Sequence, residues 1–203
     1  MEHAALRAEL LLMRQTDLEV REALRRDGSL FDGYNERMAA LHRTHNLRLQ
    51  AILAEFGWPS RRLVGEDGAA AAWFLLQHAV LAPGLMRAAL ALAEQSMPTG
   101  DCDPKHVALL TDRIRILEGR PQVYGTQHDW DSNGQLSPLP IEVPEQVDER
   151  RRRVGLEPLA ENTRRVRADA AAEGERPPTD YHARQRAADA WAKSLGKIKE
   201  DEP

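Results

Sequence analysis

Apolar residues recur every three or four positions over most of the first 118 residues, which is the spacing of one face of an α-helix. The stripe formed by Leu6, Leu10 and Met13 is a clear example. Helix start and stop signals, such as Pro83 at a first turn, divide this region further. The predicted helices cover residues 2–26, 35–56 and 69–81, a segment that begins at Pro83, and residues 103–118. The pattern predicts an all-α fold, a helical bundle of about five helices.

The helical pattern stops at Gly119, and residues 120–144 are dominated by Gly, Pro, Asp, Asn and Ser. A loop of this length in a compact domain is usually functional or disordered. Charged helices are expected over residues 147–154 and 159–172, and an amphipathic one over about 180–195. We therefore expect a helical core domain of residues 1–162, which includes the 120–144 loop, and a charged C-terminal appendage of residues 163–203 with one amphipathic helix.

Composition narrows the classes of protein to consider. The 203-residue chain carries a formal net charge of −4, which argues against general nucleic-acid binding. Its single cysteine, Cys102, excludes an internal disulfide and a multi-cysteine zinc site. Asp101 and Asp103 flank this thiol and are expected to raise its pKa, so a nucleophilic role is unfavoured. With no signal peptide and no apolar stretch of about 18 residues, we expect a cytoplasmic protein without a membrane partner.

Several polar side chains interrupt the apolar stripes. Asp17 lies between Met13 and Val20, and Asp112 lies on the face of Leu109 and Ile116. A buried carboxylate costs several kcal/mol unless it is paired or hydrogen-bonded, so such positions usually have a structural or catalytic reason.

His78, in the most apolar predicted helix, is the first candidate for acid-base catalysis. Asp112 could orient it, as the third member of a catalytic triad does. The alternatives are a core histidine bonded to a backbone carbonyl or to Asp112, and a salt bridge of Asp112 with Arg113 or Arg115.

The segment Gln122-Val123-Tyr124-Gly125-Thr126-Gln127 combines amides, a phenol, a hydroxyl and the bare backbone of a glycine. That mixture suits recognition of an amide or peptide-like substrate, or an oxyanion hole. It equally suits a latch that satisfies buried helix ends. The candidate substrate-binding residues are Gln77, Arg113, Gln122, Tyr124, Thr126 and Gln127.

A metal site is a further alternative, because a bundle could bring acidic and histidine side chains together. The candidate ligands are Asp17, His45, His78, Asp112 and Glu118. Against this, no helix carries a Glu-x-x-His pair, and the His42–His45 pair has no assigned acidic partner. We expect no cofactor, and no stoichiometric metal in protein purified without added metal.

Several segments resemble DUF6624, a bacterial family of unknown function. They include Ala72–Ala79, Leu110–Arg113, Glu118–Gln127, Pro140–Glu142, Val147–Arg151 and Val154–Leu159. The similarity covers about residues 8–162, and its most specific part is the run that ends in Tyr-Gly-Thr-Gln. Membership implies that the polar residues at these positions recur in the family, but it brings no established activity.

Our first hypothesis is a small cofactor-free acid-base enzyme, a hydrolase or transferase. It would act on an amide, ester or similar carbonyl of a small-molecule or peptide-like substrate, with His78 and Asp112 as the catalytic residues. The alternative is a non-catalytic helical binding module, and the second alternative is a carboxylate-histidine metal protein. The C-terminal helix is the surface through which a homodimer would form.

Overall fold

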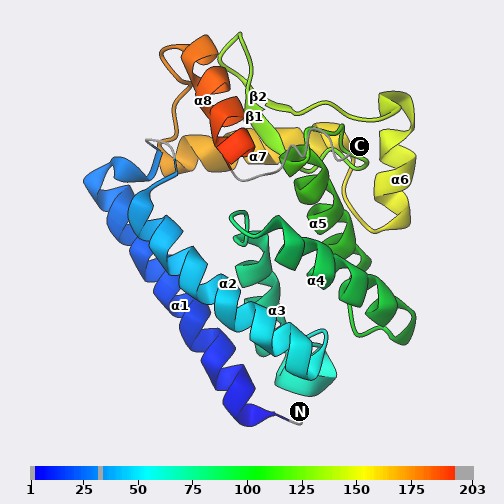
Figure 1. Cartoon of the computed structure of the whole chain (residues 1–203). Helices are drawn as coiled ribbons and strands as arrows, with labels where there is room; N and C mark the ends of the chain where they lie inside the picture. The colour runs from blue at the N-terminus through cyan, green and yellow to red at the C-terminus, as the bar shows by residue number, and fades with distance from the viewer. Residues whose placement is uncertain (1–2, 32–33, 195–203) are drawn as a thin grey trace, which may run out of the picture. The chain divides into compact units, whose positions relative to one another are not determined.

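The computed structural model describes residues 3–31 and 34–194 and is predominantly α-helical, which confirms the predicted fold class (Figure 1). Within these residues there are eight α-helices and one two-stranded sheet. The helices are α1 (Ala4–Asp27), α2 (Glu36–Phe56), α3 (Arg61–Gln77), α4 (Pro83–Ser96), α5 (Pro104–Leu117), α6 (Val147–Arg153), α7 (Leu159–Glu173) and α8 (Tyr181–Ser194), and the strands are β1 (His128–Trp130) and β2 (Leu136–Pro138).

The chain divides into two compact units, Met1–Val107 and Ala108–Pro203, and the division falls within α5. The boundary expected near residue 162 concerns independent folding and stays a prediction, although α7 crosses it without a break. The last nine residues of the expected appendage, 195–203, lie outside the described residues.

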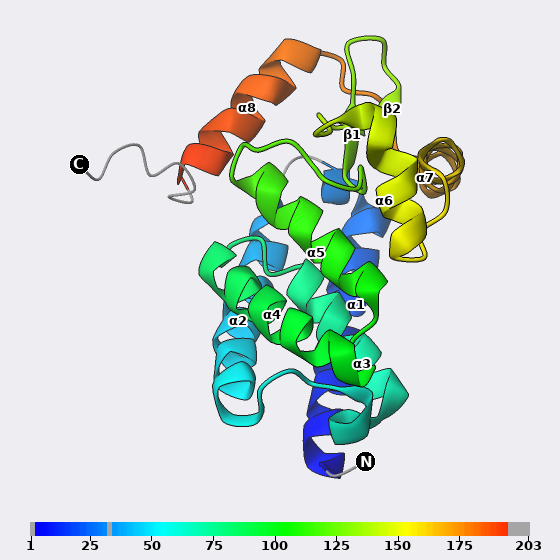
Figure 2. The same cartoon turned by 90° about the vertical axis from the view of Figure 1, so that its right-hand side faces the viewer.

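In the first unit, α2 runs back alongside α1, and α3 packs closely against α1 (Figures 1 and 2). The apolar stripe of α1 faces inward, with Leu6, Leu10 and Leu24 buried. Leu49 and Ile52 of α2 are also fully buried. The inward faces are therefore those that the helical periodicity predicts.

The third helix differs from its predicted range of 69–81. It begins at Arg61, where the Ser60 hydroxyl accepts the Leu63 N–H, and it passes a kink at Gly65, whose φ of 76° suits glycine. It ends at Gln77, with His78 as its C-cap residue. The residues that follow form the turn that leads to Pro83, which disfavours helical backbone in the residue before it. The apolar run thus comprises a helix and a turn, and His78 lies at their junction.

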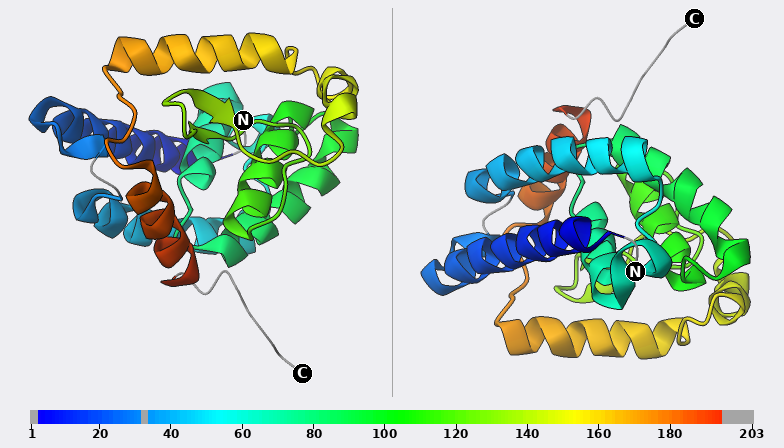
Figure 3. Two further views of the ribbon diagram at one scale, coloured as in Figure 1. Left: turned by 90° about the horizontal axis from the view of Figure 1, so that it is seen from above. Right: turned by 90° about the horizontal axis from the view of Figure 1, so that it is seen from below.

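In the second unit, β1 and β2 form an antiparallel hairpin in which Trp130 pairs with Leu136. The hairpin lies beside α7, and the Arg167 Nε donates to the Leu136 carbonyl at 2.7 Å (Figure 3). Residues 120–144 are otherwise irregular, as predicted. None of the helices in the described ranges combines the length and apolar character needed to span a membrane.

Candidate functional site

Asp17 lies in the middle of the apolar face of α1, and its side chain is fully buried. The α-helical spacing that buries Leu10 and Met13 also turns Asp17 inward. A carboxylate at such a position must find partners. Its partners are two histidines from other parts of the first unit.

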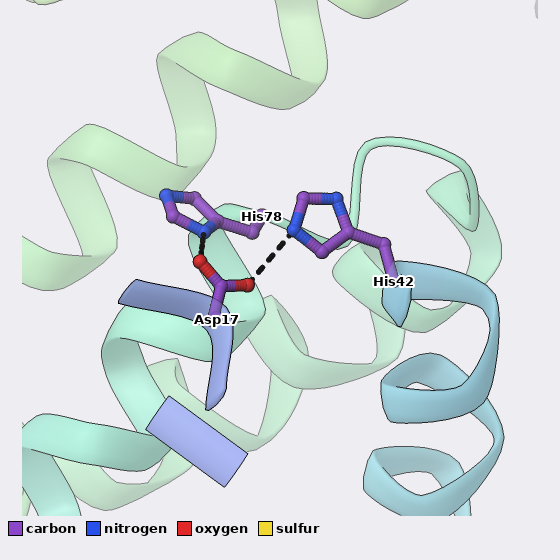
Figure 4. A group of neighbouring side chains, drawn as sticks. All are labelled: Asp17, His42 and His78. Atoms are coloured by element: carbon purple, nitrogen blue, oxygen red, sulfur yellow. Dashed lines mark hydrogen bonds and ion pairs between the residues drawn. The ribbon is translucent and has the colours of Figure 1, made fainter. Parts of the chain in front are cut away.

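Both oxygens of Asp17 are bound by imidazole nitrogens, as Figure 4 shows. The Nε2 of His42, on α2, lies 2.8 Å from Oδ2. The Nδ1 of His78, at the C-terminal end of α3, lies 3.0 Å from Oδ1. We call Asp17, His42 and His78 the Asp17 cluster.

The hydrogen bonds determine the protonation of the cluster. Burial acts to raise the pKa of Asp17, but the hydrogen bonds from His42 and His78 outweigh it and hold the pKa below its ordinary value. An ionised carboxylate only accepts hydrogen bonds, so the nitrogens that face it must both carry a proton. A neutral His78 therefore keeps its lone pair on Nε2, which has no hydrogen-bond partner among the described residues.

Tyr34 extends the network beyond His42. Its hydroxyl is hydrogen-bonded to the His42 Nδ1. Burial raises the pKa of the Tyr34 phenol above its ordinary value, and the charge of Asp17 adds to this effect. The phenol is therefore protonated at neutral pH and donates to Nδ1, which leaves the His42 proton on Nε2, facing Asp17. The chain Tyr34–His42–Asp17–His78 is consistent in every donor and acceptor.

His78 is the most accessible member of the cluster. Its side chain is 27% exposed, whereas those of His42 and Asp17 are 6% and 0% exposed. The Phe74 ring, one turn earlier on α3, contacts it edge-on at a centroid distance of 4.3 Å. His78 thus combines an Nδ1 fixed by a carboxylate, an aromatic neighbour and a partly exposed side chain.

His45 lies one turn beyond His42 on α2 and is 7% exposed. Burial lowers its pKa, while the charge of Asp17 acts in the opposite direction. Its Nδ1 is buried and has no hydrogen-bond partner in the described part of the chain. His45 is thus a neutral imidazole in the electrostatic field of the Asp17 cluster.

Asp112, in the second unit, has different partners from those expected. Its Oδ1 accepts the N–H of Val123 at 2.7 Å and of Tyr124 at 3.0 Å, and its Oδ2 accepts the N–H of Thr126 at 2.9 Å. The carboxylate that orients His78 is therefore Asp17. The expected pairing of His78 with Asp112 is wrong. The amides proposed as an oxyanion hole already bind a carboxylate of the same chain.

Gln122 and Arg151 form further hydrogen bonds with the segment whose amides bind Asp112. The fully buried Gln122 amide donates to the carbonyls of Gln127 and Leu139 and accepts the Gln127 N–H. Arg151, also fully buried, donates to the carbonyls of Tyr124 and Glu157. We call residues 122–127 the Asp112 loop. Its backbone amides and the Gln122 side chain therefore form hydrogen bonds within the second unit. Substrate recognition by the side chains of this segment stays a prediction.

Gly125 shows how closely this loop is packed. Its φ is +67°, and a Cβ at this position would lie 2.7 Å from the Ile141 Cδ1 and 2.9 Å from the Leu159 Cδ1. Both its backbone conformation and its surroundings require glycine.

The remaining candidate residues lie on several elements. Gln77 is the last residue of α3, next to His78. Arg113 is on α5, where burial lowers the pKa of its guanidinium. The Thr126 hydroxyl accepts from the Gln127 amide, and Glu118 forms an ion pair with Arg120. Their proposed roles in substrate binding or as metal ligands stay predictions.

Cys102 behaves as the sequence indicates, although for a different main reason. Its thiol is buried, and burial raises its pKa to about 11, with a smaller contribution from Asp103. A thiol with this pKa is a poor nucleophile at neutral pH.

Neither His42 nor Tyr34 was predicted from the sequence as part of the candidate site. His42 lies one helical turn after Met38 and seven residues before Leu49, both buried on the same face of α2, and this periodicity is the signal that could have identified it. Tyr34 precedes the helix and carries no periodic signal. Of the candidate metal ligands, the structure brings together Asp17 and His78 and adds His42, with donor atoms within 4.8 Å of one another.

The sequence profile of the family of unknown function DUF6624 matches residues 4–173, which extends the similarity from the expected range through α7. No curated protein and no solved structure matches the chain.

Proposed function

We propose that this chain, which belongs to the DUF6624 family, is an acid-base enzyme in which His78 transfers protons and Asp17 orients it. The observation that carries the proposal is the hydrogen bond from the His78 Nδ1 to a fully buried carboxylate. This is the arrangement by which triad enzymes hold a histidine in its catalytic tautomer.

The proposed chemistry follows from the protonation of the cluster. The Nε2 of His78 would take a proton from a water molecule or from the amine of a substrate as that group attacks a carbonyl. The resulting imidazolium would be stabilised by the negative charge of Asp17 and would return the proton to the leaving group. The reaction needs no cofactor.

His42 and Tyr34 would act as positioning residues. His42 binds the second oxygen of Asp17, which prevents rotation of the carboxylate away from His78. Tyr34 fixes the tautomer of His42 in turn. A carboxylate held on both oxygens keeps one geometry, and this preorganisation favours catalysis.

The proposed substrates are amides, esters or similar carbonyl compounds, small or peptide-like, and the enzyme would be a hydrolase or a transferase. The high pKa of Cys102 supports attack by water or by a substrate amine rather than by this thiol. The alternative is a non-catalytic binding module, in which the Asp17 cluster only satisfies buried polar groups.

The test compares His78→Gln with the wild type on nitrophenyl esters and peptide nitroanilides as probe substrates. Glutamine keeps a hydrogen-bonding group but cannot take up a proton at neutral pH. We expect turnover to fall by about 100-fold or more while the circular dichroism spectrum is retained. His182→Gln, an exposed residue on α8, is the matched control and should retain full turnover.

Normal turnover in a folded His78→Gln protein would overturn the proposal. A second measurement does not depend on the choice of substrate. Nitrogen-15 NMR of the metal-free wild type should show His78 as the Nδ1–H tautomer. A proton on Nε2 instead would contradict the assigned base.

A further inference from the structure

We infer that the Asp17 cluster is a binding site for a divalent transition-metal ion of the Zn²⁺ type. This inference goes beyond the proposed function and does not require it, because metal binding can be measured without any substrate. It concerns the same three side chains, with both histidines in their other neutral tautomer.

The first support is the chemical nature and convergence of the donor atoms. Two imidazole nitrogens and one carboxylate oxygen lie within 4.8 Å of one another. Nitrogen and oxygen donors of this kind suit Zn²⁺ and Co²⁺. Three protein ligands leave one position of a tetrahedral ion open to water or a reactant.

The second support is the geometry. The nitrogens of His42 and His78 lie 2.8 and 3.0 Å from the oxygens of Asp17. Ligands on a tetrahedral ion with bonds of about 2.0–2.1 Å are about 3.3 Å apart. An expansion of about half an ångström or less in each nitrogen–oxygen separation would bring these pairs to that spacing.

The third support is the set of polar groups around the cluster. Histidines that bind metals usually form a hydrogen bond through their other ring nitrogen, and Tyr34 provides that bond for His42. A hydroxyl is suited to both states because it can donate to a bare Nδ1 or accept from a protonated one.

The protons balance without any change in the total number bound. When the ion binds, the His42 proton moves from Nε2 to Nδ1, and Tyr34 then accepts it in a hydrogen bond. The His78 proton moves from Nδ1 to Nε2. The charge of the site changes from −1 to +1. Because Nε2 is then protonated, His78 cannot act as the proposed base, so a bound ion should inhibit that activity.

The test uses the full-length, untagged chain treated with a chelator and then dialysed. We expect equilibrium dialysis to give one Zn²⁺ per chain, and Co²⁺ to give the visible absorption of a four- or five-coordinate ion. Asp17→Asn, His42→Gln and His78→Gln should each weaken binding by on the order of 100-fold, since each removes a direct ligand or its charge. His182→Gln, the matched control, should bind as the wild type does.

Failure to bind Zn²⁺ or Co²⁺, or binding that survives the double variant His42→Gln/His78→Gln, would overturn the inference. If the variants do not fold, nitrogen-15 NMR of the wild type decides, because Zn²⁺ must change the tautomers of His42 and His78. If the ion binds but the metal-free protein turns over no probe substrate, only the proposed function fails. If His78→Gln abolishes turnover but no ion binds, only this inference fails.

Discussion

Asp17 and Asp112 are both fully buried, and each is the central group of a polar network in its own unit. Asp17 is bound by two imidazoles, whose protons can move. Asp112 is bound by three backbone N–H groups of the Asp112 loop, whose protons cannot. The two carboxylates are equally inaccessible, so burial alone does not distinguish them.

The two networks differ in the chemistry of the groups that bind the carboxylate. A backbone amide has one proton and one role, so a carboxylate bound by amides alone serves to hold the chain. An imidazole has two nitrogens, two neutral tautomers and a charged form. A carboxylate bound by imidazoles can therefore take part in chemistry, which is why we place the proposed function at Asp17.

The largest expected effect comes from Asp17→Asn. An amide cannot stabilise an imidazolium, and its NH2 group forces one of the two histidines into the other tautomer. In triad enzymes the equivalent change lowers kcat by about 10⁴-fold, and we expect a loss of about 10³- to 10⁴-fold in turnover. Stability should fall by only about 1 kcal/mol, because the histidines adapt. Turnover kinetics and urea unfolding of the same sample measure both, and a stability loss without loss of turnover would reverse the comparison.

Asp112→Asn should show the opposite pattern. The NH2 group of asparagine would face backbone N–H donors that cannot change, so at least one donor loses its partner. We expect a loss of about 2–4 kcal/mol in the free energy of unfolding, from broken hydrogen bonds to a charged group. Turnover per folded molecule should be near that of the wild type. Equal stability of Asp112→Asn and the wild type would show that the loop does not depend on this carboxylate.

The pH dependence of the free energy of unfolding tests the contribution of Asp17. The pKa of Asp17 in the folded protein lies below its ordinary value of 3.8. As pH falls, the Asp17 carboxylate is therefore protonated at a higher pH in the unfolded chain than in the folded protein. The stability that Asp17 contributes should be complete above pH 3.8 and should decrease below it. Urea unfolding of the wild type and Asp17→Asn between pH 3 and 6, in the presence of a chelator, measures the difference. A stability difference that grows as pH falls would contradict a lowered pKa for Asp17.

The smallest effect is expected from removal of residues 174–203. The truncation removes the hydrogen bond from the Trp130 indole to Glu175 and the partly exposed ion pair of Arg184 with Asp129. Surface pairs of this kind contribute about 0–1 kcal/mol each. Both carboxylate networks should be unaffected, and the melting temperature should change little. A large loss of the thermal stability of the remaining helices at high dilution would show that α8 belongs to the folded core.

The sequence allowed the helices to be predicted well because burial and helical periodicity coincide in them. Asp103 and Pro104 were expected at the start of α5, and the Asp103 carboxylate indeed accepts the Lys105 N–H. The same periodicity marked Asp17, His78 and Asp112 as polar groups on apolar faces.

The pairing of these groups could not be predicted from periodicity. A helical pattern shows which face of a helix is buried but not which helix packs against it, so His78 could be assigned to either carboxylate. The network of the Asp112 loop depends on backbone donors, which every residue type except proline supplies. Tyr34 lies in an irregular segment, where no period indicates the direction of a side chain.

The buried guanidinium of Arg151 links three segments of the second unit. It joins the Tyr124 carbonyl to the Glu157 carbonyl and to the Asn162 side chain, so residues from the Asp112 loop, α6 and the start of α7 meet on one cation. No one of these segments can detach without breaking hydrogen bonds of the others. The amide protons of Val123, Tyr124 and Thr126 should therefore exchange with solvent at the same rate as those of α6, as one cooperative opening event.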